Sequence, residues 1–435
     1  MINIFTSKEP IKDANELKER SWNKDIVTPT NNVVSIIDEI KKNGEESLLK
    51  FAEKFDNVKL DSIIVSKDEI KEAYENVTSE QIRTIEYMKS KLEKSEQSLI
   101  NNLGNIEINS DGVKINKKII PLSRVGCYIP GGKARYPSTV VMCVIPAKVA
   151  GVKQVVAISP PMKNGKIDPY TLVAADICNV DEFYKIGGAH GIAALAYGTK
   201  TIKKVDKIVG PGGLYVSLAK SIVSKDVSID MIAGPTELLI YANEQSNPQI
   251  VALDLISQAE HSEDTLCGVI TNSYDLAKKI KEQVYKIIDF GNISRREIAK
   301  KSLENNGFIA VCEDKEKIID FINEFAPEHL EILDDNELEI IEKVINAGLV
   351  LLGHNTPSSA SDYCLGSNHV LPTYKFAKSR SSLSVLDFIK INNTIEMDKK
   401  SLEQILPMLK EITMMEGLSN HYEAARGRME NDLDK

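Results

Sequence analysis

The stretch "RVGCYIPGGKARYPSTVVMCVIPAKVAGVKQVVAISP" (residues 124–160) decides the fold class of this chain. Two short apolar runs within it, "RVGCYIP" and "QVVAISP", have the length and the β-branched content of buried strands. The segment between them, "STVVMCVIPAKVAG", is long enough for a helix. A strand, a helix and a second strand in this order predict a βαβ unit with parallel strands.

The same alternation of strands and helices extends to about residue 352. Further strands are predicted at short apolar runs, which are "EFYKI", "DKIVG", "ELLIYAN", "TLCGVIT", "FIAVC", "HLEIL" and "LVLLG". Repeated βαβ units build parallel sheets that helices cover. The predicted fold class is therefore α/β, with two Rossmann-like, incomplete parallel-sheet domains and small helical N- and C-terminal segments.

The flanking segments have other patterns. Before about residue 100 the chain carries apolar residues at helical spacing, as in "NNVVSIIDEIKKNG" and "SEQIRTIEYMKSKLEKSEQSLI". A β-hairpin is predicted at "IEINSDGVKIN" (106–116), because Asp-Gly is a favoured two-residue turn. Residues 353–383 are rich in Gly, Ser, Asn and Pro and predict a long loop, after which the pattern returns to helix.

Composition limits the possible functions. The chain has 435 residues, enough for roughly two to four structural units. Its formal net charge of −9 argues against a nucleic acid or an anionic membrane as the main partner. Six scattered cysteines without a C-x-x-C pair favour buried free thiols over disulfides or a zinc cluster. The sequence shows no apolar leader and no long uncharged apolar run, so a cytoplasmic protein is expected.

Three glycine-rich loops stand between predicted strands and helices. They are "IPGGK" (129–133), "GGAHG" (187–191) and "GPGGLYV" (210–216). Backbone N–H groups at such a position can hold a phosphate, but tight βα turns also need glycine for steric reasons alone. None of the loops matches G-x-G-x-x-G or the P-loop pattern. A bound nucleotide is therefore a hypothesis that the loops permit without requiring.

Gln258 and His261 are three residues apart at the end of a predicted helix, "NPQIVALDLISQAEH" (247–261). This spacing places both side chains on one helical face. An amide oxygen beside an imidazole nitrogen is half of a possible site for a divalent metal. A hydrogen bond at the helix end would explain the same pair without a metal.

Glu328 and His329 are adjacent in "FAPEHLEIL" (325–333), just after a proline and at the start of a predicted strand. Neighbours in an extended segment point in opposite directions. A bend at Pro327 would let both line a cleft as an acid/base pair. A histidine at the start of a strand can also be purely structural.

Two further pairs combine a carboxylate with an imidazole. Asp362 and His369 are seven residues apart in the predicted loop, and long irregular loops in compact domains tend to be functional. Glu416 and His421 flank a break between two C-terminal helices, in "MMEGLSNHYEAARGR". Each of these residues would also fit an ordinary surface loop or a helix cap.

A set of longer motifs runs from about residue 20 to the C-terminus. They include "CYIPGG", "GGAHGIAALAYGT", "KVDKIVGPG", "GPTELLI", "DLISQAEH", "FAPEHLEI", "NHVLPT" and "EGLSNHYEAARGR". In this order and at this spacing they resemble the histidinol dehydrogenase family. The resemblance implies a zinc-dependent, NAD-linked enzyme of histidine biosynthesis. It would oxidise L-histidinol to L-histidine in two steps through L-histidinal, as a cytoplasmic homodimer with a shared active site.

The resemblance also implies roles for individual residues. The zinc ligands correspond to Gln258, His261, Asp362 and His421. In the family the last of these comes from the partner subunit. Glu328 and His329 match the acid/base pair, and Tyr128 matches a position that contacts NAD. The substrate contacts correspond to Thr236, Gln258, His261, His329, Asp362, His369, Glu416 and His421. Thr236 stands where the family usually has serine.

The residue types suit this chemistry. A zinc held by two imidazoles, a carboxylate and an amide oxygen keeps positive charge, and could take the amino and imidazole nitrogens of the substrate. His329, with an ordinary pKa of about 6.5, suits proton acceptance near neutral pH. Glu328 is the expected base for the addition of water to the aldehyde.

Three positions depart from the family pattern. His190 replaces the usual glutamine and Gly213 the usual asparagine, and both positions contact the dinucleotide in the family. The loop before Asp362 lacks the family's bulkier residue and glycine. Alternatives therefore stay open: a related dehydrogenase of another polar alcohol, such as a sulfonated propanediol, a zinc hydrolase, or a silent sensor. Zinc and manganese are not distinguished.

The element pattern and the resemblance together predict four parts. These are an N-terminal helical segment (1–25), a first Rossmann-like domain carrying most metal and catalytic residues (26–128 with 236–383), a second, NAD-associated Rossmann-like domain (129–235), and a C-terminal helical segment exchanged across the dimer (384–435).

Overall fold

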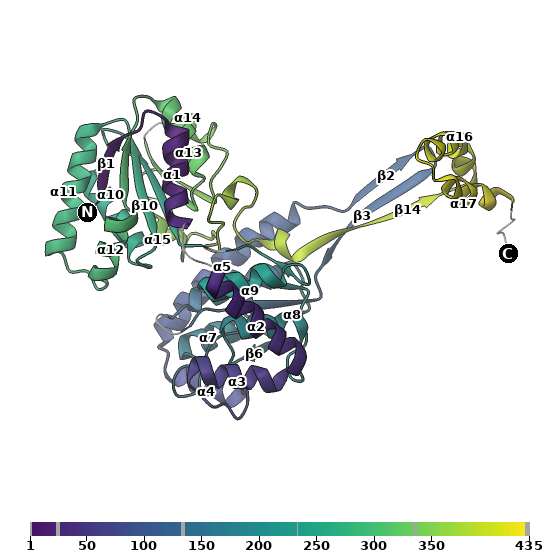
Figure 1. Cartoon of the computed structure of the whole chain (residues 1–435), viewed down its shortest axis with the longest axis horizontal. Helices are drawn as coiled ribbons and strands as arrows, with labels where there is room; N and C mark the ends of the chain where they lie inside the picture. The colour runs from purple at the N-terminus through teal and green to yellow at the C-terminus, as the bar shows by residue number, and fades with distance from the viewer. Residues whose placement is uncertain (1, 23–26, 132–134, 233, 335–336, 431–435) are drawn as a thin grey trace. The chain divides into compact units, whose positions relative to one another are not determined.

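The structure is a computed structural model that describes residues 2–22, 27–131, 135–232, 234–334 and 337–430. The chain divides into two compact units. The first comprises Met1–Ser98 and Leu122–Phe388, and the second comprises Leu99–Pro121 and Ile389–Lys435. The first unit contains two parallel sheets and the second an antiparallel one (Figure 1). The predicted α/β fold class is confirmed.

A six-stranded parallel sheet forms one half of the first unit. Its strands, in spatial order, are β1 (Asn3–Thr6), β11 (Phe308–Val311), β10 (Leu266–Thr271), β9 (Glu237–Ala242), β12 (His329–Leu333) and β13 (Leu349–Leu352). One face packs on α10 (Pro248–Ala259), α11 (Tyr274–Phe290) and α12 (Arg296–Asn306). The other packs on α1 (Pro10–Trp22), α13 (Lys315–Phe325) and α14 (Glu337–Ile341). Helices on both faces explain why the central strands read as continuous apolar runs.

A five-stranded parallel sheet forms the other half. Its order is β6 (Glu182–Tyr184), β5 (Gln154–Ile158), β4 (Arg124–Tyr128), β7 (Lys207–Val209) and β8 (Ser228–Ile229). One core contains α4 (Lys67–Glu75), α5 (Ser79–Asn101), α6 (Pro137–Val149) and α7 (Pro169–Ile177). The opposite core contains α2 (Val27–Asn43), α3 (Glu45–Asp56), α8 (Gly188–Tyr197) and α9 (Leu214–Val223). The βαβ unit predicted at 124–160 is confirmed as β4, α6 and β5.

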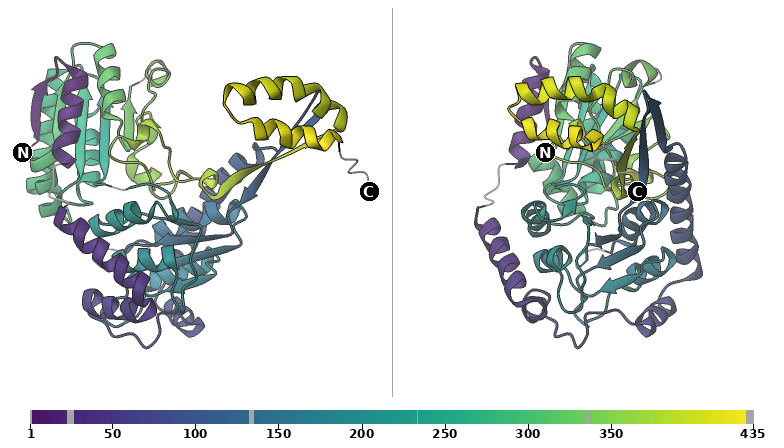
Figure 2. Two further views of the ribbon diagram at one scale, coloured as in Figure 1. Left: turned by 45° about the vertical axis from the view of Figure 1, so that its right-hand side comes forward. Right: turned by 90° about the vertical axis from the view of Figure 1, so that its right-hand side faces the viewer.

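The second unit is built on an antiparallel sheet of β2 (Ile106–Ser110), β3 (Val113–Pro121) and β14 (Ile389–Met397). The predicted hairpin turn is confirmed, since Asp111 (φ 49°) and Gly112 (φ 74°) both have the positive φ of a two-residue turn. Two helices complete this unit, α16 (Lys399–Met415) and α17 (Ser419–Glu430), and they lie side by side (Figure 2).

The structure divides the chain differently from the predicted boundaries. Residues 1–25 include β1, which joins the six-stranded sheet, and residues 384–435 include β14. Helices α2 to α5 were expected to belong with the first Rossmann-like domain, but they pack on the five-stranded sheet. The physical reason is that an amphipathic pattern shows that a helix has a buried face, but not which sheet covers that face.

The predicted loop at 353–383 is confirmed as mostly irregular, with a short helix α15 (Ser358–Ser361) and a 3₁₀ turn η1 (Phe376–Lys378), followed by η2 (Val385–Phe388). All six cysteines are free and all but Cys364 are buried, as predicted. Among the described residues, no helix is long and apolar enough to cross a membrane.

Candidate active site

The acid/base pair lies where the chain enters β12. The chain turns at Ala326, which caps α13 in the left-handed conformation (φ 47°), one residue before the predicted bend. The turn brings the two neighbouring side chains together, with Nδ1 of His329 3.7 Å from Oε2 of Glu328. Both residues are buried. Glu328 and His329 therefore lie as close together as the predicted acid/base role requires, and the role itself stays a prediction.

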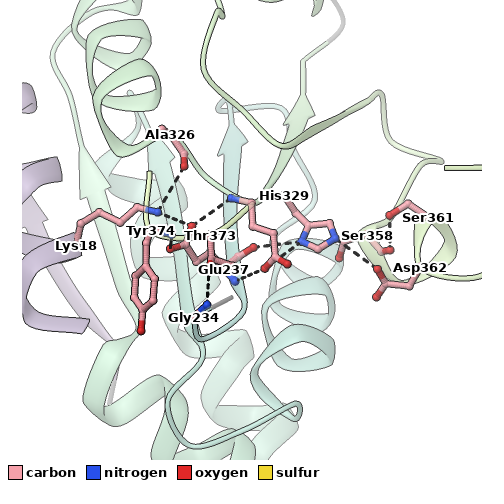
Figure 3. Close-up of polar contacts among 11 residues, drawn as sticks. Lys18, Gly234, Glu237, Ala326, His329, Ser358, Ser361, Asp362, Thr373 and Tyr374 are labelled. Carbon is pink, nitrogen blue, oxygen red and sulfur yellow. Dashed lines mark hydrogen bonds and ion pairs between the residues drawn. The ribbon is translucent and has the colours of Figure 1, made fainter. Parts of the chain in front are cut away.

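Asp362 reaches the same place from the long loop. It caps the C-terminal end of α15, and its Oδ1 lies 3.4 Å from Nε2 of His329 (Figure 3). His369 lies beside it, with Nδ1 2.8 Å from the backbone oxygen of Asp362. The loop thus folds back so that two residues seven apart in sequence lie next to His329.

The three charged groups shift one another's pKa. Burial favours the neutral imidazole, but Asp362 and Glu328 on either side outweigh it and raise the pKa of His329 to about 10. Burial raises the pKa of Glu328, partly opposed by His329. For Asp362, His329 outweighs burial and lowers the pKa. The two neighbouring carboxylates therefore favour the cationic form of the imidazole.

The hydrogen-bonding environment distinguishes the two nitrogens of His329. Nδ1 lies 3.3 Å from the backbone oxygen of Glu237, which can only accept a hydrogen bond. Nδ1 therefore keeps its proton in the neutral ring. Nε2 is buried and has no hydrogen-bond partner among the described atoms. It is the nitrogen that is left to accept a proton.

Gln258 and His261 come from the end of α10, which begins as the sequence predicts. The side chain of Asn247 accepts a hydrogen bond from the backbone of Gln249, and Pro248 occupies the first turn. Gln258 is buried, whereas His261 follows the helix and is exposed. Because α10 packs against α15, both residues stand near the helix that ends in Asp362.

These residues fit a metal chemically but do not complete a site. An amide oxygen, an imidazole nitrogen and a carboxylate oxygen are all zinc donors, and zinc usually takes four. Within the described ranges, no three His, Cys, Asp or Glu side chains are grouped as metal ligands. Gln258, His261 and Asp362 are three donors, one fewer than zinc usually takes.

The remaining predicted substrate residues are distributed over both units. Thr236 precedes β9, and its backbone oxygen accepts a hydrogen bond from the backbone N–H of Leu266 at 2.9 Å. Glu416 caps α16 and His421 lies in α17, both exposed and both in the second unit. The first unit therefore unites the acid/base pair with Asp362 and His369, but does not itself contain Glu416 or His421.

A cavity of about 850 Å³ lies at the carboxyl ends of β4, β5 and β6, where α/β sheets bind ligands. It is lined by Phe55, Asp56, Tyr128, Gly131, Pro160, Pro161, Met162, Lys163, Asn164 and Gly188. The Tyr128 hydroxyl accepts a hydrogen bond from the Gly188 backbone at 3.3 Å, and burial raises its pKa to about 12. Gly132 and Lys133 of the first glycine-rich loop lie outside the described residues.

In the loop at 210–216 one glycine is required for steric reasons and another is not. Gly210 has a φ of 113°, and a Cβ there would lie 2.2 Å from the Tyr128 carbonyl oxygen, so this glycine is a steric necessity. Gly213 caps α9, is exposed, and would admit a Cβ with nothing within 4 Å. His190 is buried against Phe51 and Phe55, with ring centroids 6.3 and 5.8 Å away.

Two buried charged residues lie at the site although the sequence pattern did not predict them there. Glu237 is the first residue of β9, and Lys18 of α1 pairs with its carboxylate (Figure 3). The available signal was a glutamate at the head of the apolar run "ELLIYA", because charged residues are almost never fully buried without a partner. Nothing in the sequence pattern identifies the partner.

Comparison with known proteins decides the family. The model of the histidinol dehydrogenase family matches residues 19–429. The chain belongs to this family. Histidinol dehydrogenase of Methanocaldococcus jannaschii is 41% identical over 428 residues and 98% of each chain. That of Clostridium acetobutylicum is 42% identical over 414 residues and 95% of each chain.

A solved histidinol dehydrogenase has the same fold. The crystal structure of the Elizabethkingia anophelis enzyme matches with a TM-score of 0.92 and 35% identity, over 99% of this chain and 98% of that one. The resemblance inferred from the motifs is confirmed. As a member of the histidinol dehydrogenase family, the protein is an NAD-dependent oxidoreductase, which replaces the zinc hydrolase interpretation.

Proposed function

We propose that the protein oxidises L-histidinol to L-histidine through L-histidinal, with two NAD molecules reduced, in histidine biosynthesis in the cytoplasm. The observation that carries the proposal is the buried Glu328–His329 pair beside Asp362, in a chain that matches histidinol dehydrogenases over nearly its full length. A related dehydrogenase acting on another polar alcohol is the alternative that the experiment below must exclude.

His329 serves as the base for both oxidations. Each step transfers a hydride from carbon to the nicotinamide and a proton from oxygen to a base. Nε2 of His329 accepts that proton, since Nδ1 is occupied by the Glu237 carbonyl. A protonated ring cannot act in this way. A metal ion held by Asp362 would leave one carboxylate beside the imidazole instead of two, and would so favour the neutral ring.

Glu328 serves as the base between the two oxidations. L-histidinal must gain a water molecule before it can lose a second hydride and become a carboxylate. Glu328 removes a proton from that water, and its raised pKa makes it a stronger base than an exposed glutamate. Its position beside His329 lets both groups act on the same carbon of the substrate.

Gln258, His261, Asp362 and His421 are the residues that would hold a zinc ion. Bound there, zinc would orient the substrate through its amino and imidazole nitrogens. Thr236, His369 and Glu416 complete the substrate contacts. NAD would occupy the cavity beside Tyr128, where the exposed Lys163 supplies positive charge for a phosphate.

A homodimer is supported by an apolar face of the second unit. The strand registers place six isoleucines on one face of its sheet, together with Lys117 and Asn393; the isoleucines are Ile106, Ile108, Ile115, Ile119, Ile391 and Ile395. Four of these isoleucines (Ile106, Ile108, Ile391 and Ile395) are exposed in the single chain. An uncovered apolar face of this kind marks an interface. A second copy that covers it would also supply His421, the ligand that the first unit lacks.

The test is NADH formation, followed by absorbance, with L-histidinol and with a sulfonated propanediol. We expect NADH with L-histidinol only, loss of the signal after chelation, and recovery with added zinc. His329→Asn, which keeps a similar shape but cannot act as the base, is the matched control for contaminating activity. NADH formation with the sulfonated alcohol and none with L-histidinol would overturn the assignment.

A further inference from the structure

A buried lysine lies behind the acid/base pair. Lys18 is 1% exposed, and its Nζ pairs with the carboxylate of Glu237, which is equally buried (Figure 3). The same Nζ lies 3.5 Å from the Ala326 carbonyl oxygen and 4.2 Å from the centre of the Phe325 ring. Desolvation of a buried ion pair is unfavourable unless each charge is compensated, and these contacts compensate the lysine.

Glu237 connects this lysine directly to the acid/base pair. Its backbone N–H donates to Oε2 of Glu328 at 2.7 Å, and its own Oε2 accepts from the backbone N–H of Glu328 at 3.2 Å. Its carbonyl oxygen faces Nδ1 of His329, and its Oε1 accepts from the backbone of Tyr374 at 3.2 Å. One residue therefore holds the carboxylate of Glu328 and the ring of His329 in place.

We propose that Lys18 and Glu237 are positioning residues, which set the orientation and the electrostatic environment of the Glu328–His329 pair. The inference rests on the proposed function of that pair. Neither side chain of the new pair need touch the substrate, because both act through Glu328 and His329.

The charges explain why the two residues must act together. The groups that face Glu328 are His329, Glu237, Lys18 and the buried thiol of Cys267. The Glu237 carboxylate raises the pKa of Glu328, whereas Lys18 and Glu328 attract each other and so favour the charged carboxylate. As a pair, the two opposite charges largely cancel. When either charge is removed, the remaining charge shifts the pKa of Glu328.

The experiment uses Lys18→Met, Glu237→Gln and the double variant in the full-length, zinc-loaded enzyme. We measure the pH dependence of kcat/KM for L-histidinal oxidation, whose acidic limb reports the base in the free enzyme. Lys18→Met should move the acidic limb up by roughly one pH unit, and Glu237→Gln should move it down by a similar amount. The double variant should return it to within a few tenths of a unit of the wild-type position.

Both single variants leave a buried charge unpaired, and so both destabilise the fold. Loss of stability alone would therefore affect both in the same way, whereas the proposed positioning role predicts shifts of the acidic limb in opposite directions. Lys220→Met is the matched control: Lys220 forms a buried ion pair with Asp230 in the other half of the first unit. It should lower stability without moving the limb. Shifts of the two single variants in the same direction, or none in folded enzyme, would overturn the proposal.

The proposal can still be tested if one of the single variants does not fold. If Lys18→Met does not fold, the proposal still requires the limb of the double variant to lie above that of Glu237→Gln, and an equal or lower limb contradicts it. Wild-type enzyme without any activity on L-histidinol would refute the proposed function instead. The two failures are therefore distinguishable.

Discussion

We propose that His329 accepts a proton in both oxidations and that Glu328 acts only on the water added between them, so the two roles can be measured separately. We predict that His329→Asn slows both oxidations by roughly 10²- to 10⁴-fold, because each step releases a proton to this ring. Glu328→Gln should slow the oxidation of L-histidinal much more than that of L-histidinol. Single-turnover NADH formation from each substrate is the measurement. Equal losses in the two half-reactions of Glu328→Gln would contradict this division.

Gly213 offers a direct test of the cofactor site. An asparagine fits there, because the backbone has an ordinary negative φ of −67° and the space beside it is open. We predict that Gly213→Asn lowers the KM for NAD by about two- to tenfold, as expected for one added hydrogen bond. Gly213→Ala, which adds a Cβ without an amide, is the control. An unchanged KM in both variants would place the dinucleotide away from this loop.

At the scale of elements, a carboxyl pair of buried Glu331 and half-buried Asp254 connects the parts that carry the site. Glu331 of β12 accepts a hydrogen bond from the backbone of Ser358 at 2.6 Å, at the start of the helix that ends in Asp362. It also lies beside Asp254 of α10, one turn before Gln258. Burial raises the pKa of Asp254 to about 6, and burial together with Asp254 raises that of Glu331 to about 8.

This pair predicts a pH-dependent stability. Because the folded-state pKa of Glu331 (about 8) lies above its ordinary value of 4.5, the folded protein holds a proton that the unfolded chain releases between these values. The stabilisation is full below the ordinary value and is lost as the pH rises toward 8. Glu331→Gln can still accept the bond from Ser358 but does not titrate.

The measurement is thermal unfolding in the presence of a chelator, from about pH 5 to about pH 9. The wild-type midpoint should fall relative to that of Glu331→Gln as the pH rises. Glu244→Gln, at an exposed position, is the control and should follow the wild type. Parallel curves for wild type and Glu331→Gln would show that this carboxyl pair holds no extra proton.

The same elements show what the sequence could and could not predict. The strands were predictable because buried parallel strands such as β10 and β11 are nearly continuous apolar runs between turn residues. The sheet on which α2 to α5 pack was not, since helical periodicity carries no information about the partner. The ion pair of Lys18 with Glu237 joins residues 219 positions apart, and no local pattern connects them.

The catalytic pair illustrates the same limit. Glu328 and His329 were recognisable as candidates from their residue types, but their approach depends on a left-handed residue, Ala326, that the sequence does not reveal. The roles of His421 and Glu416 came from the family resemblance alone. A local sequence pattern carries no information about residues that come together only in a proposed dimer.

At the scale of the whole molecule, the proposed site is shared by two chains. We predict that inactive His421→Ala and inactive His329→Asn chains regain activity when they are mixed and allowed to exchange subunits. One site of each hybrid then combines an intact His329 with an intact His421, so activity should approach about a quarter of the wild-type value. Hybrids that are proven to form but stay inactive would refute the shared site.

The most direct test of the proposed reaction is the number of NADH molecules formed for each L-histidinol consumed at completion, with zinc-loaded wild-type enzyme. We predict two, because His329 accepts a proton in each of two oxidations and Glu328 activates the water that is added between them. A ratio of one, with L-histidinal accumulating, would contradict the role of Glu328 in the second half-reaction. No NADH at all from folded, zinc-loaded protein would contradict the proposed substrate.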